Sequence, residues 1–354
     1  MILTTTVKLV LTEDQKASLL KTMERFNSAC NYIAEVAYAN KVANRSRLHR
    51  LVYYDVRERF RLSAAMTVRA INKVCETYKR DKSIQPYFRP HGAIVYNRLM
   101  LSREGTEYVS LLTLRGRSLV RFRAGKAQAA LLSRPWREVD LLYRDNTFYL
   151  SICVDVPEPP PDEPTGFLGV DLGIANIATT SDGQTFAGNH LQNVRARFSR
   201  LRAKLQRKGT KSAKRLLKRR SRRERRFQRD LNHRIAKAIV TQAKDTRRGI
   251  ALEDLTHIRS RDPASKSLRQ VIHSWAFRQL REFVEYKARR AGVKVVIVDP
   301  RNTSRTCSVC GHVDKANRPD QATFRCVACG FAANADHNAA LVIAARAGLS
   351  CRAA

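Results

Sequence analysis

Residues 166–184 read GFLGVDLGIANIATTSDGQ, two short apolar runs separated by a glycine turn. We expect the first strand to end at Asp171, ahead of the turn at Gly173, and the second strand to cover residues 177–180. A further turn is expected at Asp182-Gly183. This stretch therefore predicts the opening strands of a sheet, with a carboxylate at the end of the first one.

Strands and helices alternate along the rest of this half of the chain. The sequence predicts, in order, a rough helical pattern over 195–229, a helix over 233–243, a strand over 249–252, a helix over 268–291, a strand over 293–300 and a closing helix over 334–348. This alternation favours an α/β sheet domain.

The preceding half is expected to be β-rich. Residues 1–11 alternate apolar and polar side chains, and similar runs return between 85 and 156, with a hairpin turn at Asp145-Asn146. Clustered prolines in PEPPPDEPTG, residues 157–166, can neither continue a helix nor donate within a sheet, so they mark a linker between the halves.

A helical insert follows the first strand. Thr12 has Gln15 three positions on, as a helix-capping box requires, and helical periodicity continues to about residue 82. The candidate core positions in its later part are Leu51, Val56, Phe60, Ala64, Val68, Ile71 and Val74.

The charge of the chain limits its function. Its 354 residues include 67 Lys and Arg against 31 Asp and Glu, a formal net charge of +36. Such an excess disfavours an enzyme of neutral metabolites and points to a polyanion, DNA, RNA or both. A basic membrane-surface protein is the alternative, but no lipidation motif, amphipathic anchor, bilayer-length apolar run or export signal is found. We therefore expect a soluble, unexported protein.

The charge is concentrated in residues 195–229, which hold eighteen Lys and Arg against the single acid Glu224. The apolar residues keep a helical period that is interrupted at Gly209-Thr210, so a basic helical hairpin is expected. Charge runs usually form solvated faces, but this density favours contact with phosphate. The candidate nucleic-acid-binding residues are Arg207, Lys208, Lys211, Lys214, Arg215, Lys218, Arg219, Arg222, Arg223 and Arg226.

Four of the eight cysteines form two matched motifs, CSVCG and CVACG. Cys307, Cys310, Cys326 and Cys329 have the spacing of a structural Zn²⁺ site, and a glycine follows each second cysteine. A redox dithiol is the weaker alternative. Four sulfur ligands leave no open position for water, so we expect the zinc to be structural rather than catalytic.

Three acids stand at the ends of predicted elements. Asp171 ends the first apolar strand, Glu253 follows another strand, and Asp336 begins the closing helix. Each has an ordinary alternative, since Asp171 could cap a turn, Glu253 could pair with Arg259, and Asp336 could serve the helix N-terminus. Asp254, next to Glu253, is expected either to have no part in the site or to support it from outside the metal ligands, because adjacent strand residues point to opposite sides.

Taken together, these acids fit the demands of phosphodiester hydrolysis. Two Mg²⁺ ions about 3.5–4 Å apart can generate the attacking hydroxide and stabilise the leaving oxygen. Such hard cations prefer carboxylate oxygens that converge from several elements. Asp171, Glu253 and Asp336 can supply this convergence, and no nucleophilic serine or cysteine is needed.

The same residues carry a family resemblance. GVDLG at 169–173, LED at 252–254, TSRTCSVCG at 303–311, FRCVACG at 324–330 and NADHNAA at 334–340 occur in the order found in the TnpB (OrfB) family of transposon-encoded proteins, relatives of the type V CRISPR effectors. The resemblance covers roughly residues 166–348, and the preceding half is similar more loosely.

The resemblance implies an RNA-guided DNA endonuclease that uses a guide noncoding RNA and cleaves double-stranded target DNA next to a short flanking motif. It implies a ribonuclease H-like (RuvC-like) nuclease domain over 166–306 and 331–354 with Asp171, Glu253 and Asp336 as its acids, and a zinc ribbon over 307–330. It also implies a β-rich, barrel-like wedge domain over 1–11 and 83–160 and a helical recognition insert over 12–82. The expected setting is the cytoplasm of a prokaryotic cell, at the nucleoid.

Two other functions remain open from the sequence. One is an RNA-guided DNA-binding protein that does not cleave. The other is a DNA-strand transferase, a transposase, that uses a related set of carboxylates.

Overall fold

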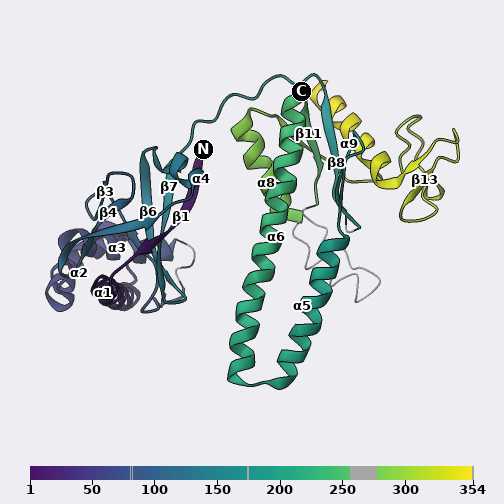
Figure 1. Ribbon diagram of the computed structural model, residues 1–354. Helices are drawn as coiled ribbons and strands as arrows, with labels where there is room; N and C mark the ends of the chain where they lie inside the picture. Colours follow the sequence, from purple (N-terminus) through teal and green to yellow (C-terminus); the bar gives the residue numbers. More distant parts are fainter. Residues whose placement is uncertain (80, 82, 174, 256–276, 353–354) are drawn as a thin grey trace. The chain divides into compact units, whose positions relative to one another are not determined.

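The computed structural model describes residues 1–79, 81, 83–173, 175–255 and 277–352. Its chain forms two compact units, Met1–Pro157 and Glu158–Ala354, which are coloured from purple to teal and from teal to yellow in Figure 1. Among these described residues, no helix combines the length and apolar character needed to cross a membrane.

An antiparallel sheet of seven strands, in the order β2-β6-β7-β1-β5-β4-β3, forms the first unit. Its strands are β1 (Ile2–Val10), β2 (Ile94–Tyr96), β3 (Leu101–Glu104), β4 (Tyr108–Thr113), β5 (Gly116–Arg123), β6 (Trp136–Arg144) and β7 (Thr147–Asp155), with the short helix α4 (Lys126–Leu132) before β6. The two edge strands, β2 and β3, are consecutive in the chain, and the Tyr96 hydroxyl donates to the carbonyl of Leu112 in β4 at 2.9 Å. The sheet is therefore nearly closed on itself.

The expected turn between β6 and β7 is confirmed. Asp145 and Asn146 have φ values of 50° and 60°, the paired positive values of a two-residue hairpin turn whose twist suits antiparallel strands. The Tyr143 hydroxyl donates to Asn146 Oδ1 at 2.7 Å and closes the turn on one side.

Three helices follow β1 and pack into the same apolar core as the sheet: α1 (Glu13–Ala39), α2 (Arg45–Phe60) and α3 (Ala64–Tyr78). The predicted capping box is confirmed, because Thr12 Oγ1 accepts from Gln15 N at 3.2 Å and Gln15 Oε1 accepts from Thr12 N at 3.1 Å. Two predicted core positions are wrong. Leu51 is 47% exposed because α2 buries only its opposite face, and Ala64 is exposed at the first position of α3.

The second unit is built on a sheet of five strands in the order β10-β9-β8-β11-β12. Its strands are β8 (Phe167–Asp171), β9 (Asn176–Thr180), β10 (Thr185–Ala187), β11 (Gly249–Glu253) and β12 (Val295–Val298). The first three are antiparallel, whereas β11 runs parallel to β8 and β12 parallel to β11. The predicted strands of this half are thus confirmed, and the carboxyl ends of β8 and β11 meet at one edge.

Helices cover both faces of this sheet. Leu168 and Val170 of β8 pack with α6 (Lys211–Asp245) and α8 (Phe277–Ala291). Ala251 of β11 packs on the other face with Ile343 and Ala347 of α9 (Ala335–Arg352). Alternate strand residues point to opposite faces, so the short apolar strands are buried on both sides. The predicted helix over 268–291 is described from Phe277 onward, and its earlier part lies outside the described residues.

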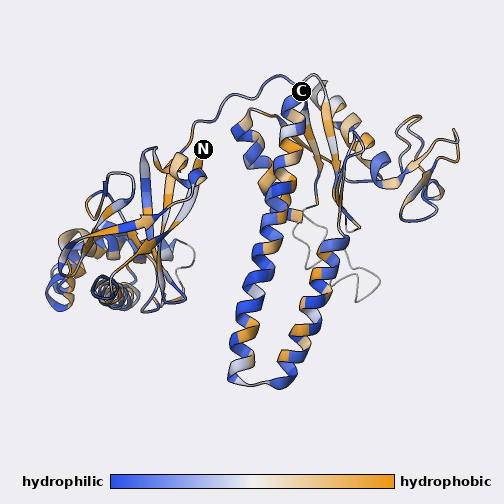
Figure 2. Cartoon of the chain, viewed as in Figure 1, coloured by the Kyte–Doolittle hydropathy of each residue, from blue (hydrophilic) through white to orange (hydrophobic). Residues whose placement is uncertain are grey.

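A long helical hairpin of α5 (Asn189–Lys208) and α6 carries the basic run, as predicted. Gly209 ends α5 with a φ of 62°, and the Thr210 hydroxyl caps α6 by accepting from Ala213 N at 3.2 Å. The separate helix expected over 233–243 is wrong as an independent element, because α6 continues through it without a glycine or proline to end it. Figure 2 shows this hairpin as mostly hydrophilic beyond the sheet.

Candidate active site and metal centre

Asp171 and Glu253 emerge side by side at one edge of the second sheet. Leu252 lies opposite Val170 in the parallel pair of β11 and β8, so the next residue of each strand is one of the two acids. Glu253 is only 7% exposed. The strand order therefore brings together two carboxylates that are 82 positions apart in sequence.

Asp336 reaches the same site from the first turn of α9. Gly169 allows this approach, because a Cβ atom at that position would collide with the carbonyl oxygen of Ala340 in α9. Asn334 Oδ1 caps the helix by accepting from Asp336 N at 3.0 Å and from His337 N at 3.2 Å. Asn176 of β9 then holds the carboxylate, donating from Nδ2 to Asp336 Oδ2 at 2.8 Å.

The electrostatics of Asp171 show that the three acids act on one another. Burial, together with the negative charges of Glu253 and Asp336, raises the pKa of Asp171 to about 8. The positive charge of Arg318 and the N–H of Leu172 oppose this rise. A cation among these oxygen ligands would relieve both the burial and the repulsion, and carboxylate oxygens suit a hard divalent ion such as Mg²⁺.

Arg318, like Asn176, is a residue of this site that the sequence did not reveal. Its Nη2 lies 3.9 Å from Asp336 Oδ1, and it also donates to the carbonyl of Gln321 at 3.0 Å. Arg318 stands between the two cysteine pairs, in a segment without helical or strand periodicity. No pattern in the sequence could have placed this guanidinium beside the acids.

Asp254 turns away from the acids, as the alternation of strand residues predicts. Its Oδ1 accepts from Nη1 of Arg281 in α8 at 2.9 Å. The predicted alternative of a pair between Glu253 and Arg259 concerns a residue outside the described part of the chain.

The four clustered cysteines converge as predicted. Their sulfur atoms all lie within 4.8 Å of one another. Cys307 Sγ is 3.7 Å from Cys329 Sγ, and Cys310 Sγ is 3.6 Å from Cys326 Sγ. These distances are too long for a disulfide and match the edge of a tetrahedron with sulfurs about 2.3 Å from a central zinc, about 3.8 Å. The cluster can therefore hold a metal ion.

The two cysteine pairs lie in separate backbone turns of the same type. Gly311 N donates to Cys307 O and Gly330 N donates to Cys326 O, both at 3.0 Å. Both glycines have a φ of 75°, a conformation that other residues adopt only with strain. The turns are connected by Asn317, which is fully buried and accepts from Val327 N at 2.9 Å while donating to Arg305 O at 2.9 Å.

The cysteine cluster is also tied to the acidic site. Asn338, one turn of α9 beyond its start, is fully buried. Its Oδ1 accepts from Ser308 N at 3.0 Å, and its Nδ2 donates to Thr306 O at 2.8 Å. Asp336 lies two residues before it, so the turn that carries Cys307 helps to fix the position of that carboxylate.

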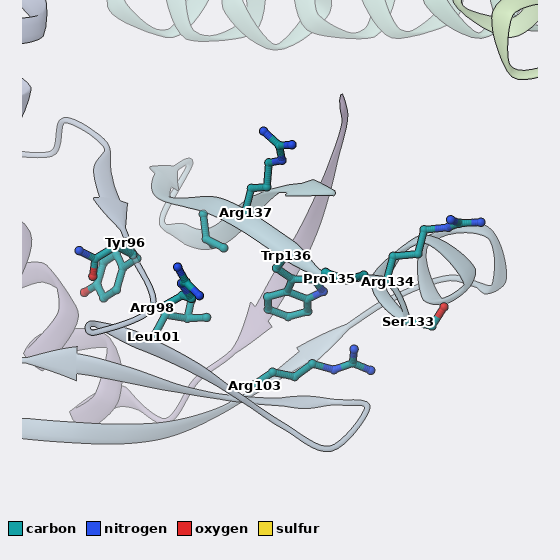
Figure 3. A pocket seen from close by; sticks show the side chains of 11 residues that line it. Tyr96, Arg98, Leu101, Arg103, Ser133, Arg134, Pro135, Trp136 and Arg137 are labelled. Atoms are coloured by element: carbon teal, nitrogen blue, oxygen red, sulfur yellow. The ribbon is translucent and has the colours of Figure 1, made fainter. Parts of the chain in front are cut away.

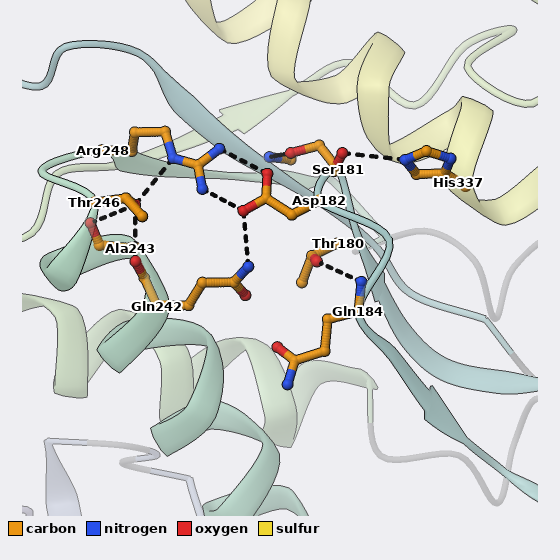
Figure 4. Close-up of polar contacts among 10 residues, drawn as sticks. Thr180, Ser181, Asp182, Gln184, Gln242, Ala243, Thr246, Arg248 and His337 are labelled. Atoms are coloured by element: carbon orange, nitrogen blue, oxygen red, sulfur yellow. Dashed lines mark hydrogen bonds and ion pairs between the residues drawn. The ribbon is translucent and has the colours of Figure 1, made fainter.

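A second polar network holds the β9–β10 turn against α6 and the residues that follow it (Figure 4). Asp182 accepts from both terminal nitrogens of Arg248 and from Gln242 Nε2. The arginine hydrogen bonds lower the pKa of Asp182. Beside it, His337 Nε2 lies 3.1 Å from the carbonyl oxygen of Ser181, which links the turn to the helix residue next to Asp336.

The candidate nucleic-acid-binding residues line the helical hairpin. Nine of the ten are exposed, and Arg222 is half-buried. The single acid of this segment, Glu224, accepts from Arg202 Nη2 at 2.8 Å and joins the two helices. Phe198, Leu201, Leu205 and Leu217 lie on the facing sides. The hairpin therefore has an apolar seam and exposes its cations.

Two family models match this chain. Residues 151–257 match the OrfB model described as "Probable transposase", and residues 277–343 match the TNB domain of Cas12f1-like proteins. The first match contains Asp171 and Glu253, and the second contains Asp336 and all four clustered cysteines.

Curated relatives and a solved structure agree with these matches. The chain is 35% identical over 219 residues to the CRISPR-associated endodeoxyribonuclease Cas12f1 of Sulfoacidibacillus thermotolerans. The aligned region covers 57% of this chain and 50% of the relative. It is 33% identical over 150 residues to a TnpB-like protein of Methanocaldococcus jannaschii, covering 41% of this chain and 53% of the relative. The chain spans about half the length of these relatives.

The fold resembles that of Cas12f1 in a cryo-EM structure of a complex with sgRNA and target DNA. The TM-score is 0.64 at 17% sequence identity, and the match covers 94% of this chain and 83% of that chain. The observed α/β architecture is therefore one that Cas12f1 also has.

Proposed function

From its relationship to the TnpB (OrfB) family of transposon-encoded proteins, we propose that this chain is an RNA-guided, metal-dependent DNA endonuclease. It acts on double-stranded DNA beside a short flanking motif, in the cytoplasm of a prokaryotic cell at the nucleoid. The observation that carries the proposal is the meeting of Asp171, Glu253 and Asp336 at one edge of the sheet, where burial, together with the charges of the other two acids, raises the pKa of Asp171 to about 8. A buried cluster of like charges is costly without a bound cation.

The second unit acts as a RuvC-like nuclease domain of ribonuclease H-like fold. Three antiparallel strands, β10, β9 and β8, followed by two parallel strands, β11 and β12, support this assignment. The acids at the ends of β8 and β11 and at the start of α9 then occupy one edge of the sheet. The nearly closed sheet of the first unit serves as the wedge domain, with α1, α2 and α3 as its recognition insert.

Asp171, Glu253 and Asp336 would hold the catalytic Mg²⁺. When bound, two such ions activate a water for attack on the phosphodiester and stabilise the leaving oxygen. Asn176 orients Asp336 through its hydrogen bond, while the Arg318 guanidinium is available to a non-bridging phosphate oxygen near the acids. The four cysteines hold a structural Zn²⁺, which stabilises the segment that carries Arg318.

The basic hairpin binds the phosphate backbone of the guide RNA or of its heteroduplex with target DNA. Its cations are exposed along both helices, and α6 alone spans about 50 Å at 1.5 Å per residue. A backbone grip of this kind recognises helical geometry rather than sequence, which suits an enzyme whose specificity is delegated to base pairing.

Cleavage by the reconstituted complex tests the proposal. The protein is expressed beside its native flanking DNA, the co-purifying RNA is sequenced, and matched and mismatched duplexes are offered with Mg²⁺. We expect cleavage of the matched duplex into ends with 5′-phosphate and 3′-hydroxyl groups, and no cleavage by Asp171→Asn although its RNA affinity is unchanged. Guided binding without cleavage by the wild type would assign a binding protein instead, and joined DNA ends would assign a strand transferase.

A further inference from the structure

The nearly closed sheet of the first unit contains a cavity of about 360 Å³ beside Trp136. Its floor includes apolar side chains that are largely buried, among them Leu101 and Val139. Four arginines, Arg98, Arg103, Arg134 and Arg137, are among the residues that line it (Figure 3). No acidic residue lines this cavity.

The aromatic part of the cavity is held in place. Trp136 Nε1 donates to the carbonyl of Leu132 at 3.0 Å, and Arg103 Nη1 donates to the same oxygen at 2.7 Å. Arg103 Nε also donates to Gly105 O at 2.8 Å, and its guanidinium lies over the Trp136 ring, 5.6 Å from the centroid. A half-buried indole fixed in this way is a preformed surface for stacking.

Two of the four arginines are free to bind a ligand. Arg137 already forms an ion pair with Asp155, in which Arg137 Nε lies 2.5 Å from Asp155 Oδ2. The guanidinium groups of Arg98 and Arg134 have no hydrogen-bond or ion-pair partner among the described residues. Two unneutralised cations at the rim of an apolar, aromatic cavity complement a ligand with one flat ring and adjoining negative charge.

We propose that this cavity captures one unpaired nucleotide of a nucleic-acid strand. The base stacks on Trp136, and the flanking phosphates bind Arg98 and Arg134. The volume lies at the lower end of the range for small-molecule sites, so it accommodates a single nucleotide and not a duplex. Stacking does not discriminate strongly among bases, so the site grips the strand with little sequence preference. This proposal does not rest on cleavage and involves none of the three acids.

The test follows Trp136 fluorescence in the full chain. The chain has two tryptophans, so Trp275→Phe leaves Trp136 as the only reporter. Hexa-adenylate RNA, hexa-deoxyadenylate DNA and free AMP are titrated in turn. We expect saturable quenching by a strand, at least tenfold weaker binding of AMP, and at least tenfold weaker strand binding in the Arg98→Ala/Arg134→Ala variant. Tighter binding of RNA than of DNA, or the reverse, identifies the source of the strand, and both uphold the proposal.

Arg123→Ala/Arg144→Ala is the matched control. Both residues are exposed, on β5 and β6, and lie outside the cavity, so the pair removes two charges, as the test variant does, without altering the site. The quenching constant of this control should change less than twofold. Strand binding without quenching, an unchanged constant in the double arginine variant, or AMP binding as tightly as the hexamer would each overturn the proposal.

A cross-linking measurement locates the nucleotide independently of affinity. A hexamer with a central 4-thiouridine, or 4-thiothymidine in the DNA form, is irradiated in complex with the full chain and the peptides are sequenced by mass spectrometry. The proposal expects a cross-linked peptide that includes Trp136. Cross-links confined to the basic hairpin would contradict it.

Discussion

The Nη2 atom of Arg318 lies 3.9 Å from Oδ1 of Asp336, so a cation from the segment between the cysteine pairs stands beside a carboxylate of α9. Its charge also lowers the pKa of Asp171, against the rise caused by burial and by the neighbouring acids. We expect Arg318→Ala to slow cleavage at neutral pH by about tenfold or more and to move the rising limb of the pH–rate profile to higher pH. Single-turnover rates across pH 6–9 measure both effects.

Arg325→Ala is the control for that variant, because Arg325 is exposed on β13 (Thr323–Arg325) between the same cysteine pairs. Its cleavage rate should match the wild type. An Arg318→Ala enzyme with the wild-type rate and pH profile would show that this guanidinium does not act at the acidic site.

Asp171→Asn tests how far the buried, charged carboxylate lowers the stability of the folded protein. Because the folded-state pKa of about 8 exceeds the ordinary value of about 3.9, the folded protein binds this proton more tightly than the unfolded chain. The bound proton on Asp171 therefore stabilises the folded protein fully below about pH 4, and this stabilisation is lost as the pH rises to about 8. Without Mg²⁺, Asp171→Asn should therefore gain stability over the wild type as the pH rises, on the order of a few kcal/mol at pH 8.5.

Thermal unfolding at pH 5 and pH 8.5 measures this difference. The buffer contains neither Mg²⁺ nor a chelator, since a chelator would also remove zinc. Adding Mg²⁺ at pH 8.5 should raise the unfolding temperature of the wild type and not that of the variant. The same unfolding temperatures for both proteins at every pH would contradict the raised pKa.

The periodic patterns in the sequence predicted the elements that position the site but not every residue in it. The apolar runs that end at Asp171 and Glu253 predict strands. The carboxyl ends of parallel neighbouring strands meet at one edge of a sheet, so the convergence of these two acids could be inferred. Asn176 and Arg318 could not, because each reaches Asp336 through packing between distant segments. A local pattern carries no information about such contacts.

The limits of local patterns also explain the predictions that the structure contradicts. Helical period predicts which face of a helix is apolar, but it does not say whether another element covers that face, so Leu51 was misplaced. The dense charge of residues 211–229 obscured the continuity of α6, which runs without interruption to Asp245. Its stability comes from packing against α8 and the sheet at its far end, and this depends on tertiary structure.

Cys307→Ser tests the metal centre. Loss of one sulfur ligand should lower the zinc content from about one per chain to near zero and destabilise the C-terminal region, at most by the roughly 10–16 kcal/mol of metal free energy in isolated fingers. Cleavage should fall as well, because Asn338 connects the metal-binding turn to the start of α9.

Cys153→Ser is the control, since Cys153 lies in β7 of the first unit and is only half-buried. Elemental analysis and thermal unfolding provide the readouts. Wild-type protein that is fully folded without zinc, or a Cys307→Ser variant that retains one zinc per chain, would contradict the structural role.

Neutralising the hairpin tests its contact with phosphate. We change Lys214, Arg215, Lys218 and Arg219 to glutamine together, all of them exposed on α6. The slope of log affinity against log salt for guide RNA should flatten by about 3, since each phosphate contact in single strands contributes about 0.7. Affinities measured between 50 and 300 mM salt give the slope.

The matched control removes four exposed cations elsewhere in the second unit: Lys244, Arg289, Arg290 and Arg301. The hairpin variant and the control variant have the same net charge, so an effect of net charge alone would change the salt slope of both equally. Equal salt slopes for the hairpin variant and the control would show that the hairpin cations face only solvent.

Metal location in the complex tests the central claim most directly. The protein is bound to guide RNA and to a target DNA with a non-cleavable phosphorothioate linkage, Mn²⁺ replaces Mg²⁺, and anomalous scattering identifies the ions. We predict Mn²⁺ within coordination distance of Asp171, Glu253 and Asp336, at the target phosphate. Ions bound at the phosphate without these carboxylates would contradict the account.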